Sequence, residues 1–254
     1  MGARTVLITG GSRGMGAAIS RAFAADGAHV LIAARRDTGL ARELAQKCGE
    51  RVRFVATDVR KVTDLRAAVG MAMQWTGRLD VLVNNAGYSA WRPLQEIDEE
   101  FWDDMLNTNL RSVLFAMQAA AKVLGKGGAI VNISSLAGKR GSANNSAYCA
   151  SKFGVNALTQ SLAKELGPRG VRVNAVCPVY VRTEGLDEAL VDPRSPAGSR
   201  PIADYLAEFA KSQTALGVLP EAEQVAATCV FLASPAAGAI TGQCINVDCG
   251  VLPQ

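Results

Sequence analysis

The sequence predicts an α/β fold, a Rossmann-type doubly wound parallel sheet with helices on both faces. Short apolar runs rich in Val, Ile and Leu, typical of strands buried on both faces, alternate with helical stretches along all 254 residues. The first of these runs leads through a glycine-rich turn into an alanine-rich helix. No repeat, low-complexity segment or linker divides the sequence, so residues 1–254 are expected to form a single domain.

The strands and helices are expected in strict alternation. About seven runs are expected to be strands, because each is short, apolar and bounded by turn residues. These runs occupy residues 4–9, 29–34, 52–57, 80–84, 128–134, 170–177 and 240–248. Helices are expected from the glycine turn to about residue 27, and then at residues 37–48, 62–75, 99–124, 147–166, 202–212 and 221–233.

Residues 184–200 interrupt this alternation. They are mixed in character and contain proline, which predicts a mobile loop before the helix at residues 202–212. A long loop on an otherwise tight α/β fold is usually functional. We therefore expect the segment at about 184–215 to form a lid over the substrate.

Composition and charge exclude several classes of partner. The formal net charge is only +4, and no run of Lys or Arg indicates a nucleic-acid surface. No apolar run reaches membrane-spanning length, and the N-terminus shows no signal peptide. The expected partner is therefore a small molecule, with neither nucleic acid nor membrane.

The cysteines and the histidine narrow the chemistry further. The 6 cysteines form no CxxC pair and several lie in apolar runs, so we expect reduced thiols and a cytoplasmic protein. The sequence has 1 histidine, His29, which excludes a histidine-rich metal site, and no metal is expected. A Ser-His-Asp or Cys-His nucleophile system would have to use this residue.

The glycine-rich turn, Gly10-Gly-Ser-Arg-Gly-Met-Gly16, lies between a strand and a helix, where a dinucleotide site needs it. Gly10 allows a tight turn, Gly14 lets the backbone approach a pyrophosphate, and Gly16 lets helix and strand pack closely. The helix N-terminus then faces the negative charge. The alternative is a glycine-rich loop used only as a turn.

Tyr148 and Lys152 lie four residues apart and therefore about one turn apart on the same face of a helix. An ammonium group close to a phenol favours the phenolate and is expected to lower the pKa of Tyr148. The pair would then act as a proton-transfer group. The alternative is a chance spacing, because any helix can carry these residues.

Thr9-Gly-x-x-x-Gly-x-Gly16 together with Tyr148-x-x-x-Lys152 resembles the short-chain dehydrogenase/reductase family over essentially the whole chain. Asn84-Asn-Ala-Gly87 after the fourth strand is similar to a further family motif. Within the family the chain looks like the NADP-dependent branch of 3-oxoacyl-carrier-protein and tropinone reductases. The resemblance implies the strand order 3-2-1-4-5-6-7 and a homotetramer.

The resemblance also implies the catalytic residues Asn109, Ser135, Tyr148 and Lys152. The serine would share a substrate oxygen with the tyrosine, and Ser134 would be its structural neighbour. The asparagine would lie in a bend of its helix and hold a water linked to the lysine. Without the resemblance, a polar, solvent-facing side of that helix is the alternative for Asn109.

The cofactor site follows from the same family pattern. Asp58 would hold the adenine amino group, although it also suits a turn or helix N-cap. Val179 replaces the usual glycine beside the nicotinamide, and Cys249 also departs from the family. The residues expected to bind the cofactor are Gly10, Ser12, Arg13, Gly14, Met15, Gly16, Arg35, Arg36, Asp58, Val59, Asn85, Ala86, Gly87, Tyr148, Lys152, Pro178, Val181 and Thr183.

The end of the second strand favours NADP(H) over NAD(H). NAD-preferring relatives place a carboxylate there to bind the ribose hydroxyls, whereas this chain has Ala34. Arg35 and then Arg36 follow it, and Arg13 lies in the glycine turn. NADP-dependent relatives carry basic residues at the positions of Arg13 and Arg35, which together could clamp a 2′-phosphate. The alternative is that these arginines are solvated and Asp37 turns inward to bind NAD.

The expected function is an NADP(H)-dependent oxidoreductase that transfers a hydride between nicotinamide and a carbonyl or secondary alcohol, with Tyr148 as general acid/base. The alternatives are an NAD-dependent sugar or polyol dehydrogenase, a sugar-nucleotide epimerase or dehydratase, and a non-catalytic dinucleotide sensor. The sequence names no substrate. Basic residues near the expected mouth suit a carboxylate or phosphate group. Candidate substrate contacts are Trp91, Arg92, Val179 and Tyr180, with Lys139, Arg140 and Arg182 nearby.

Overall fold

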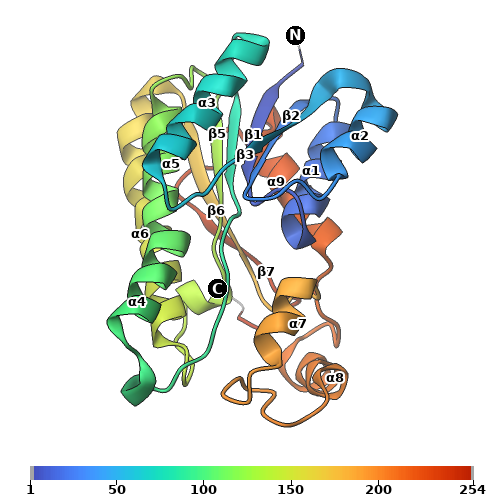
Figure 1. The fold of residues 1–254 in the computed structure, drawn as a ribbon, viewed down its shortest axis with the longest axis vertical. Helices are drawn as coiled ribbons and strands as arrows, with labels where there is room; N and C mark the ends of the chain where they lie inside the picture. The colour runs from blue at the N-terminus through green and yellow to red at the C-terminus, as the bar shows by residue number, and fades with distance from the viewer. Residues whose placement is uncertain (1–2, 253–254) are drawn as a thin grey trace.

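The computed structural model describes residues 3–252 and contains a 7-stranded sheet in the order β3-β2-β1-β4-β5-β6-β7 (Figure 1). Every neighbouring pair of strands is parallel. The predicted fold class and strand order are therefore confirmed. The strands are β1 (Thr5–Thr9), β2 (His29–Ala34), β3 (Val52–Ala56), β4 (Val81–Asn84), β5 (Ala129–Ile133), β6 (Arg172–Pro178) and β7 (Cys244–Val247).

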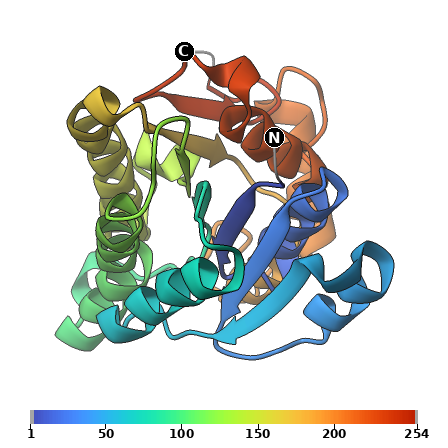
Figure 2. The ribbon, with the colours of Figure 1, turned by 90° about the horizontal axis from the view of Figure 1, so that it is seen from above.

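Two layers of helices cover the sheet, as the view from above shows (Figure 2). On one face lie α1 (Gly14–Ala25), α2 (Leu40–Cys48) and α9 (Ala222–Ala233). On the other lie α3 (Val62–Thr76), α5 (Ser112–Ala121) and α6 (Ser146–Leu166). Short 3-10 turns occupy Gly49–Arg51, Leu94–Glu96, Leu136–Gly138, Gly167–Arg169 and Pro235–Ala237.

Alternation along β1 shows why the sheet is buried on both sides. Val6 and Ile8 belong to the apolar core beneath α1 and α9, whereas Leu7 between them belongs to the core beneath α3 and α5. Successive side chains of a strand point to opposite faces, so each strand contributes to both cores. This explains why the strands appear in the sequence as continuous apolar runs rather than alternating ones.

Strand order reverses between β1 and β4, which are hydrogen-bonded neighbours in the centre of the sheet. Ligands of open α/β sheets bind beyond the carboxyl ends of the strands at this point. In Figure 1, α4 (Glu99–Leu106) lies below one side of the sheet, and α7 (Glu184–Leu190) and α8 (Ile202–Gln213) lie below the other. These helices therefore flank the place where a ligand is expected.

Two predicted elements differ from the structure. The helix expected at 99–124 is divided by a π-helical segment, Asn107–Arg111, between α4 and α5, and it ends at Ala121. The loop expected at 184–200 begins with helix α7, so that part of the prediction was wrong. Thr183 caps α7 by accepting a hydrogen bond at Oγ1 from Leu186 N, 3.3 Å away, a local start signal that the proline-containing sequence obscured.

The lid segment has an apolar cluster of its own. Its members lie apart from the two cores of the sheet and join α7 and α8 to the loop after β4. Its fully packed residues are Trp91, Leu190, Ala197, Tyr205 and Leu206. The segment expected to form the lid is thus held by a small core of its own.

No helix within residues 3–252 is long and apolar enough to cross a membrane.

Candidate active site

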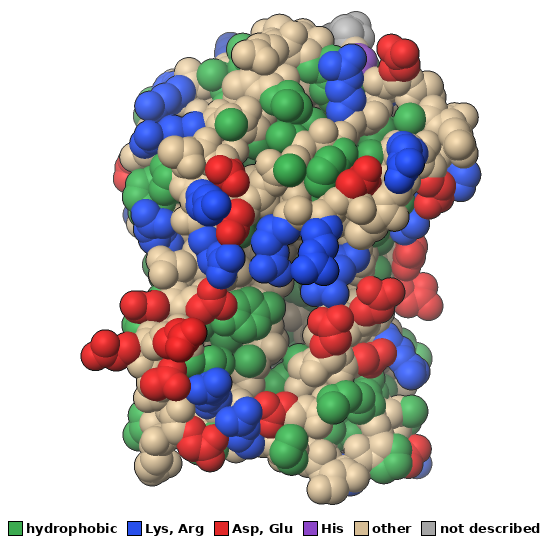
Figure 3. Space-filling view, in the orientation of Figure 1, with side chains coloured by type: hydrophobic (Ala, Val, Ile, Leu, Met, Phe, Trp, Pro, Cys, Tyr) green, Lys and Arg blue, Asp and Glu red, His purple; other side chains and the backbone are tan. Residues whose placement is uncertain are grey.

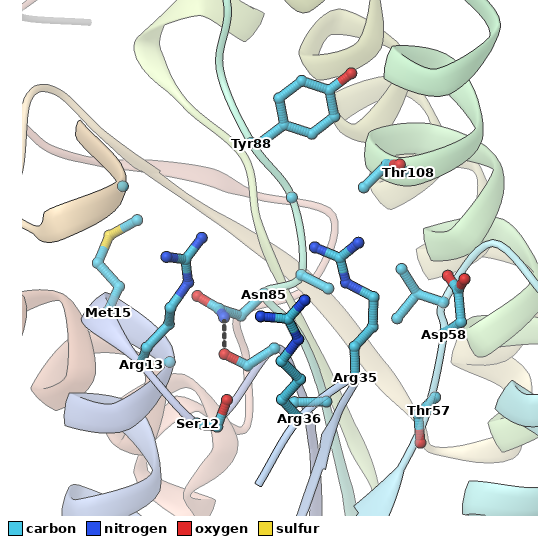
Figure 4. Close-up of a pocket in the computed structure, with 18 of the residues that line it drawn as sticks. Ser12, Arg13, Met15, Arg35, Arg36, Thr57, Asp58, Asn85, Tyr88 and Thr108 are labelled. Carbon is cyan, nitrogen blue, oxygen red and sulfur yellow. Dashed lines mark hydrogen bonds between the residues drawn. The ribbon is translucent and has the colours of Figure 1, made fainter. Parts of the chain in front are cut away.

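A cavity of about 580 Å³ opens at the carboxyl ends of β1, β2 and β4 (Figure 4). The glycine turn, the segments that follow β2, β3 and β4, and the start of α7 all contribute to its wall. Most residues expected to bind the cofactor meet here. They are Gly10, Ser12, Arg13, Gly14, Met15, Gly16, Arg35, Arg36, Asp58, Val59, Asn85, Ala86, Gly87 and Thr183.

Close backbone approach shapes the glycine turn. Gly10 and Gly14 have φ values of 64° and 52°, in the left-handed region that favours glycine. A Cβ added to Gly16 would lie 2.0 Å from Gly10 O, so only glycine lets α1 begin this close to β1. The turn consequently leaves room for a pyrophosphate at the N-terminus of α1.

Arginines dominate one wall of the cavity. Arg13, Arg35 and Arg36 extend from the glycine turn and the end of β2 toward the same space in Figure 4. A band of Lys and Arg side chains also crosses the waist of the molecule beside a hollow in Figure 3. Asp37 is exposed, and its Oδ1 accepts a hydrogen bond from Gly39 N at 2.8 Å. This carboxylate is therefore engaged in its own turn.

Asp58 lies at the opposite wall and is tied to Arg60. Its Oδ1 accepts a hydrogen bond from Arg60 N at 3.1 Å, and its Oδ2 accepts one from Arg60 Nη2 at 2.8 Å. The hydrogen bonds from Arg60 lower the pKa of the Asp58 carboxyl to about 2. Because α3 begins at Val62 with Lys61 as its cap residue, Asp58 acts as a turn residue and not as the N-cap.

Helix α6 and the end of β5 bring the predicted catalytic side chains together. Lys152 is buried, its Nζ donates a hydrogen bond to Ile133 O at 2.9 Å, and the same atom lies 5.6 Å from the centroid of the Tyr148 ring. Ser135 Oγ accepts a hydrogen bond from Ala137 N at 3.1 Å, and the same hydroxyl favours the ionised form of Tyr148 by lowering the pKa of its phenol. Ser134 is buried, and its Oγ donates to Lys152 O at 3.3 Å, which holds β5 against α6.

Burial controls the protonation of this group. Removal from water lowers the pKa of Lys152 to about 8. It also raises the pKa of the half-buried Tyr148 to about 12, although the Ser135 side chain acts in the opposite direction. The lowered tyrosine pKa expected from the sequence is therefore wrong for the chain in this structure. Desolvation of the phenol is the largest cause of the shift, and the lysine ammonium is directed to the Ile133 carbonyl instead of the phenol.

Asn109 lies in the π-helical segment and is fully buried. Its Nδ2 donates to Tyr88 O at 2.8 Å, and its Oδ1 accepts from Tyr88 N at 3.0 Å. A Cβ added to Gly87 would lie 3.0 Å from Asn109 Oδ1 and 3.8 Å from Lys152 Nζ. Gly87 thus allows the asparagine and the lysine to approach the same point from different helices.

Sequence reasoning missed part of the cavity wall. Thr38 Oγ1 donates to Ser12 O at 2.8 Å and so ties the segment after β2 to the glycine turn. The sequence signals for these residues were the position of Thr38 two residues after Arg36 and that of Arg60 two residues after Asp58. The additional lining residues are Ala34, Thr38, Thr57, Arg60, Tyr88, Asp104, Thr108, Glu184 and Gly185.

Four expected cofactor residues do not line this cavity. These four are Tyr148 and Lys152 on α6, and Pro178 and Val181, which are buried at the end of β6 and just after it. Within residues 3–252, the non-glycine residues with positive φ are Asn144 and Cys249, so Val179 follows an ordinary backbone path. Cys249, which departs from the family pattern, has a φ of 53° that favours glycine.

No cluster of metal-ligating side chains occurs within residues 3–252.

The expected substrate residues divide into two groups. Val179 and Tyr180 are partly exposed, and Tyr180 Oη lies 3.0 Å from Tyr205 Oη. Trp91 is only 4% exposed and belongs to the lid cluster. Arg92 pairs with Asp98 at 3.2 Å.

The basic mouth is smaller than the sequence suggested. The guanidinium of Arg92 covers the Phe101 ring as well as pairing with its carboxylate. Lys139 Nζ donates to Cys244 O at 2.7 Å and is also engaged. Arg140 and Arg182 remain exposed. Two basic side chains, Arg140 and Arg182, are therefore left to bind an anionic substrate at this mouth.

The buried lysine should make stability depend on pH. The unfolded chain binds a proton at Lys152 up to about pH 10.4, whereas the folded chain releases it near pH 8, so unfolding free energy rises with pH between these values. Relative to Lys152→Met, wild type should gain about 1–2 kcal/mol between pH 7 and pH 9.5. Urea unfolding of both proteins at both pH values measures this difference. Equal changes with pH in the two proteins would show that Lys152 is not a source of the effect.

Comparison with known proteins agrees with this geometry. A family model described as Enoyl-(Acyl carrier protein) reductase matches residues 10–252. The L-2,3-butanediol dehydrogenase of Corynebacterium glutamicum is 36% identical over 98% of this chain and 98% of its own length. The 3-oxoacyl-(acyl-carrier-protein) reductase of Chlamydia muridarum is 34% identical over 98% of this chain and 97% of its own length.

A solved structure gives the same result in three dimensions. The ligand-free aldohexose dehydrogenase of Thermoplasma acidophilum superposes with a TM-score of 0.88 at 29% identity, covering 99% of this chain and 98% of that one. The chain therefore belongs to the short-chain dehydrogenase/reductase family of oxidoreductases.

Proposed function

We propose that the protein is an NADP(H)-dependent oxidoreductase that interconverts a carbonyl compound and a secondary alcohol. The observation that carries the proposal is the meeting of Ser135, Tyr148 and Lys152 beside a cavity lined by the glycine turn. When bound, the nicotinamide supplies or accepts the hydride. The remaining chemistry is proton transfer at the substrate oxygen, and these three side chains are suited to it.

Each side chain has a separate role in this proposal. Tyr148 is protonated at neutral pH, because burial raises its pKa to about 12, and it donates a proton to the substrate oxygen during reduction. Ser135 hydrogen-bonds the same oxygen and stabilises charge that develops there. Lys152, with a pKa near 8, is mostly cationic at pH 7 and favours the tyrosinate that remains.

Asn109 and Lys152 extend this proton path toward the loop after β4. Both approach the space in front of Gly87, and the asparagine is fixed there by two hydrogen bonds to the Tyr88 backbone. We assign Asn109 the positioning of a proton-carrying water beside the lysine.

The preference for NADP(H) rests on charge at the end of β2. Ala34 lines the cavity where a carboxylate would bind the ribose hydroxyls, and Arg13, Arg35 and Arg36 line the same wall. Asp37, the residue through which NAD binding was conceivable, is exposed and bonded to Gly39 N. Guanidinium groups bind phosphate through charge-assisted hydrogen bonds, so this wall suits a 2′-phosphate.

A sugar or polyol is the second candidate substrate class. Tyr180 Oη lies 3.0 Å from Tyr205 Oη, so a residue that follows β6 and a residue of α8 bring two hydroxyls together. Hydroxyl groups can both donate and accept, which suits a substrate that carries several hydroxyls. The aldohexose dehydrogenase with the same fold acts, by its name, on such a substrate.

We further propose a cytoplasmic homotetramer. The 6 cysteines are all free, which suits a reducing compartment. Trp102 on α4, Leu114 on α5 and Phe153 on α6 are 42%, 37% and 46% exposed although they are large and apolar. Exposed apolar side chains on adjacent helices are typical of a surface that another subunit covers.

Replacement of Tyr148 by Phe tests the reaction. We expect nearly complete loss of turnover with little change in cofactor affinity, because only the proton-transferring hydroxyl is removed. Turnover is followed at the absorbance band of the reduced nicotinamide with a panel of ketones, diols and aldoses, which also separates the two substrate classes. Thr228→Val, which removes a hydroxyl on α9 that donates to Gln224 O at 3.0 Å and does not line the cavity, is the control. A Tyr148→Phe enzyme with turnover within a few-fold of wild type would exclude the proposed role.

Replacement of Arg35 by Ala tests the cofactor preference. Loss of a charge-assisted hydrogen bond to phosphate costs about 1.5–3 kcal/mol, so kcat/KM for NADPH should fall by about one to two decades. The value for NADH should change little, because that cofactor lacks the phosphate. Wild-type enzyme that uses NADH as well as NADPH would contradict the assignment.

The tetramer is tested by light scattering at micromolar concentration. We expect a mass of four chains, and a smaller mass for a variant in which both Trp102 and Phe153 are replaced by Glu, because buried charge opposes association. The single variant Met71→Glu, at another exposed apolar residue on α3, is the control. A monomeric wild-type protein would refute the proposal.

A further inference from the structure

An ion pair joins the lid to the glycine turn at the edge of the cofactor cavity. Glu188 Oε1 on α7 is 3.0 Å from Nη1 of Arg13, a residue 175 positions away in the sequence. The side chains are 62% and 56% exposed, so water and ions reach both of them. The contact links the lid to the wall that would bind the cofactor phosphate.

The position of Glu188 is set by interactions that do not involve Arg13. Thr183 caps the start of α7, and Leu190 near its end is 1% exposed within the lid cluster. Glu184 and Gly185, in the first turn of the same helix, line the cavity. Glu188 is one helical turn beyond Glu184 and is therefore held on the cavity side of α7.

Arg13 differs in this respect from the other arginines of the cavity wall. Within residues 3–252, Arg35 and Arg36 have no carboxylate at ion-pair distance, whereas Arg13 has Glu188. The glycine turn thus carries its cationic side chain already neutralised in part. A ligand can bind the guanidinium groups of Arg35 and Arg36 without displacing a carboxylate. A ligand that binds Arg13 must compete with the carboxylate of Glu188.

Competition follows from the chemistry of the two anions. Carboxylate and phosphate oxygens bind the same N–H groups of a guanidinium. A phosphate on Arg13 must either displace Glu188 or lie close to its negative charge, and like charges repel. An exposed ion pair contributes little free energy, so a dianionic phosphate can displace it.

We propose that Glu188 is a selectivity residue that competes with the 2′-phosphate of NADP(H) for Arg13. The proposal rests on the proposed role of Arg13 as a phosphate ligand. Glu188 lowers the affinity for the phosphorylated cofactor and leaves that for NAD(H) unchanged. Binding of the phosphate also frees α7 from the glycine turn, which couples cofactor identity to the lid.

Equilibrium binding of NADPH and NADH to the full chain tests the competition. Glu188→Gln should lower the Kd for NADPH about two- to five-fold, the range expected for an exposed ion pair, and leave the Kd for NADH unchanged. The gain should shrink at high salt, which screens exposed charges. Glu208→Gln removes another exposed lid carboxylate, paired with Arg200 at 2.8 Å, and should change neither Kd.

A double-mutant cycle shows whether Glu188 changes the Kd for NADPH through Arg13. In an Arg13→Ala background, Glu188→Gln should no longer change the Kd for NADPH. Weaker NADPH binding by Glu188→Gln, or an equal change for both cofactors, would overturn the competition. If Arg13→Ala weakens NADPH binding while Glu188→Gln has no effect, the competition fails and the phosphate site stands. If Arg13→Ala leaves NADPH binding unchanged, the proposed role of Arg13 fails and the competition fails with it.

Discussion

The site depends on a clamp between the ends of the two central strands. Thr9 Oγ1 accepts hydrogen bonds from Asn85 N at 3.1 Å and Ala86 N at 3.2 Å. In return, Asn85 Nδ2 donates to Thr9 O at 3.1 Å and to Gly10 O at 3.0 Å. Because the strand order reverses between these strands, the clamp fixes the width of the opening in which a dinucleotide would lie.

The clamp also explains why positions 10 and 16 of the glycine turn must be glycine. A Cβ added to Gly10 would lie 2.8 Å from Ala86 Cα, and one added to Gly16 would lie 2.5 Å from Asn85 Nδ2. The first contact can be relieved only by moving the backbone after β4, and the second would displace the Asn85 side chain from its bonds to Thr9 O and Gly10 O. The glycine turn and the Asn84–Gly87 segment therefore form one unit, although they are distant in the sequence.

Much of this arrangement could be predicted from the sequence, because it follows from local patterns and from motif residues at fixed offsets. The strands, the glycine turn and the position of Tyr148 one turn from Lys152 belong to this class. The predictions that were wrong concerned properties that depend on tertiary packing. The rise in the tyrosine pKa comes from burial, and the inward turn of Trp91 comes from the apolar cluster of the lid. The contact of Arg13 with Glu188 joins segments whose relation no local pattern specifies.

The separate apolar cluster of the lid has an evolutionary consequence. Trp91, Leu190, Tyr205 and Leu206 pack among themselves and share no member with the two cores that hold the sheet. Substitutions in that cluster can reshape the segment around α7 and α8 while the two cores that hold the sheet keep their stability. In a fold divided in this way, substitutions in one small core can change which substrate is bound. This fits a family whose members are named for a butanediol, an aldohexose and a 3-oxoacyl-(acyl-carrier-protein) substrate.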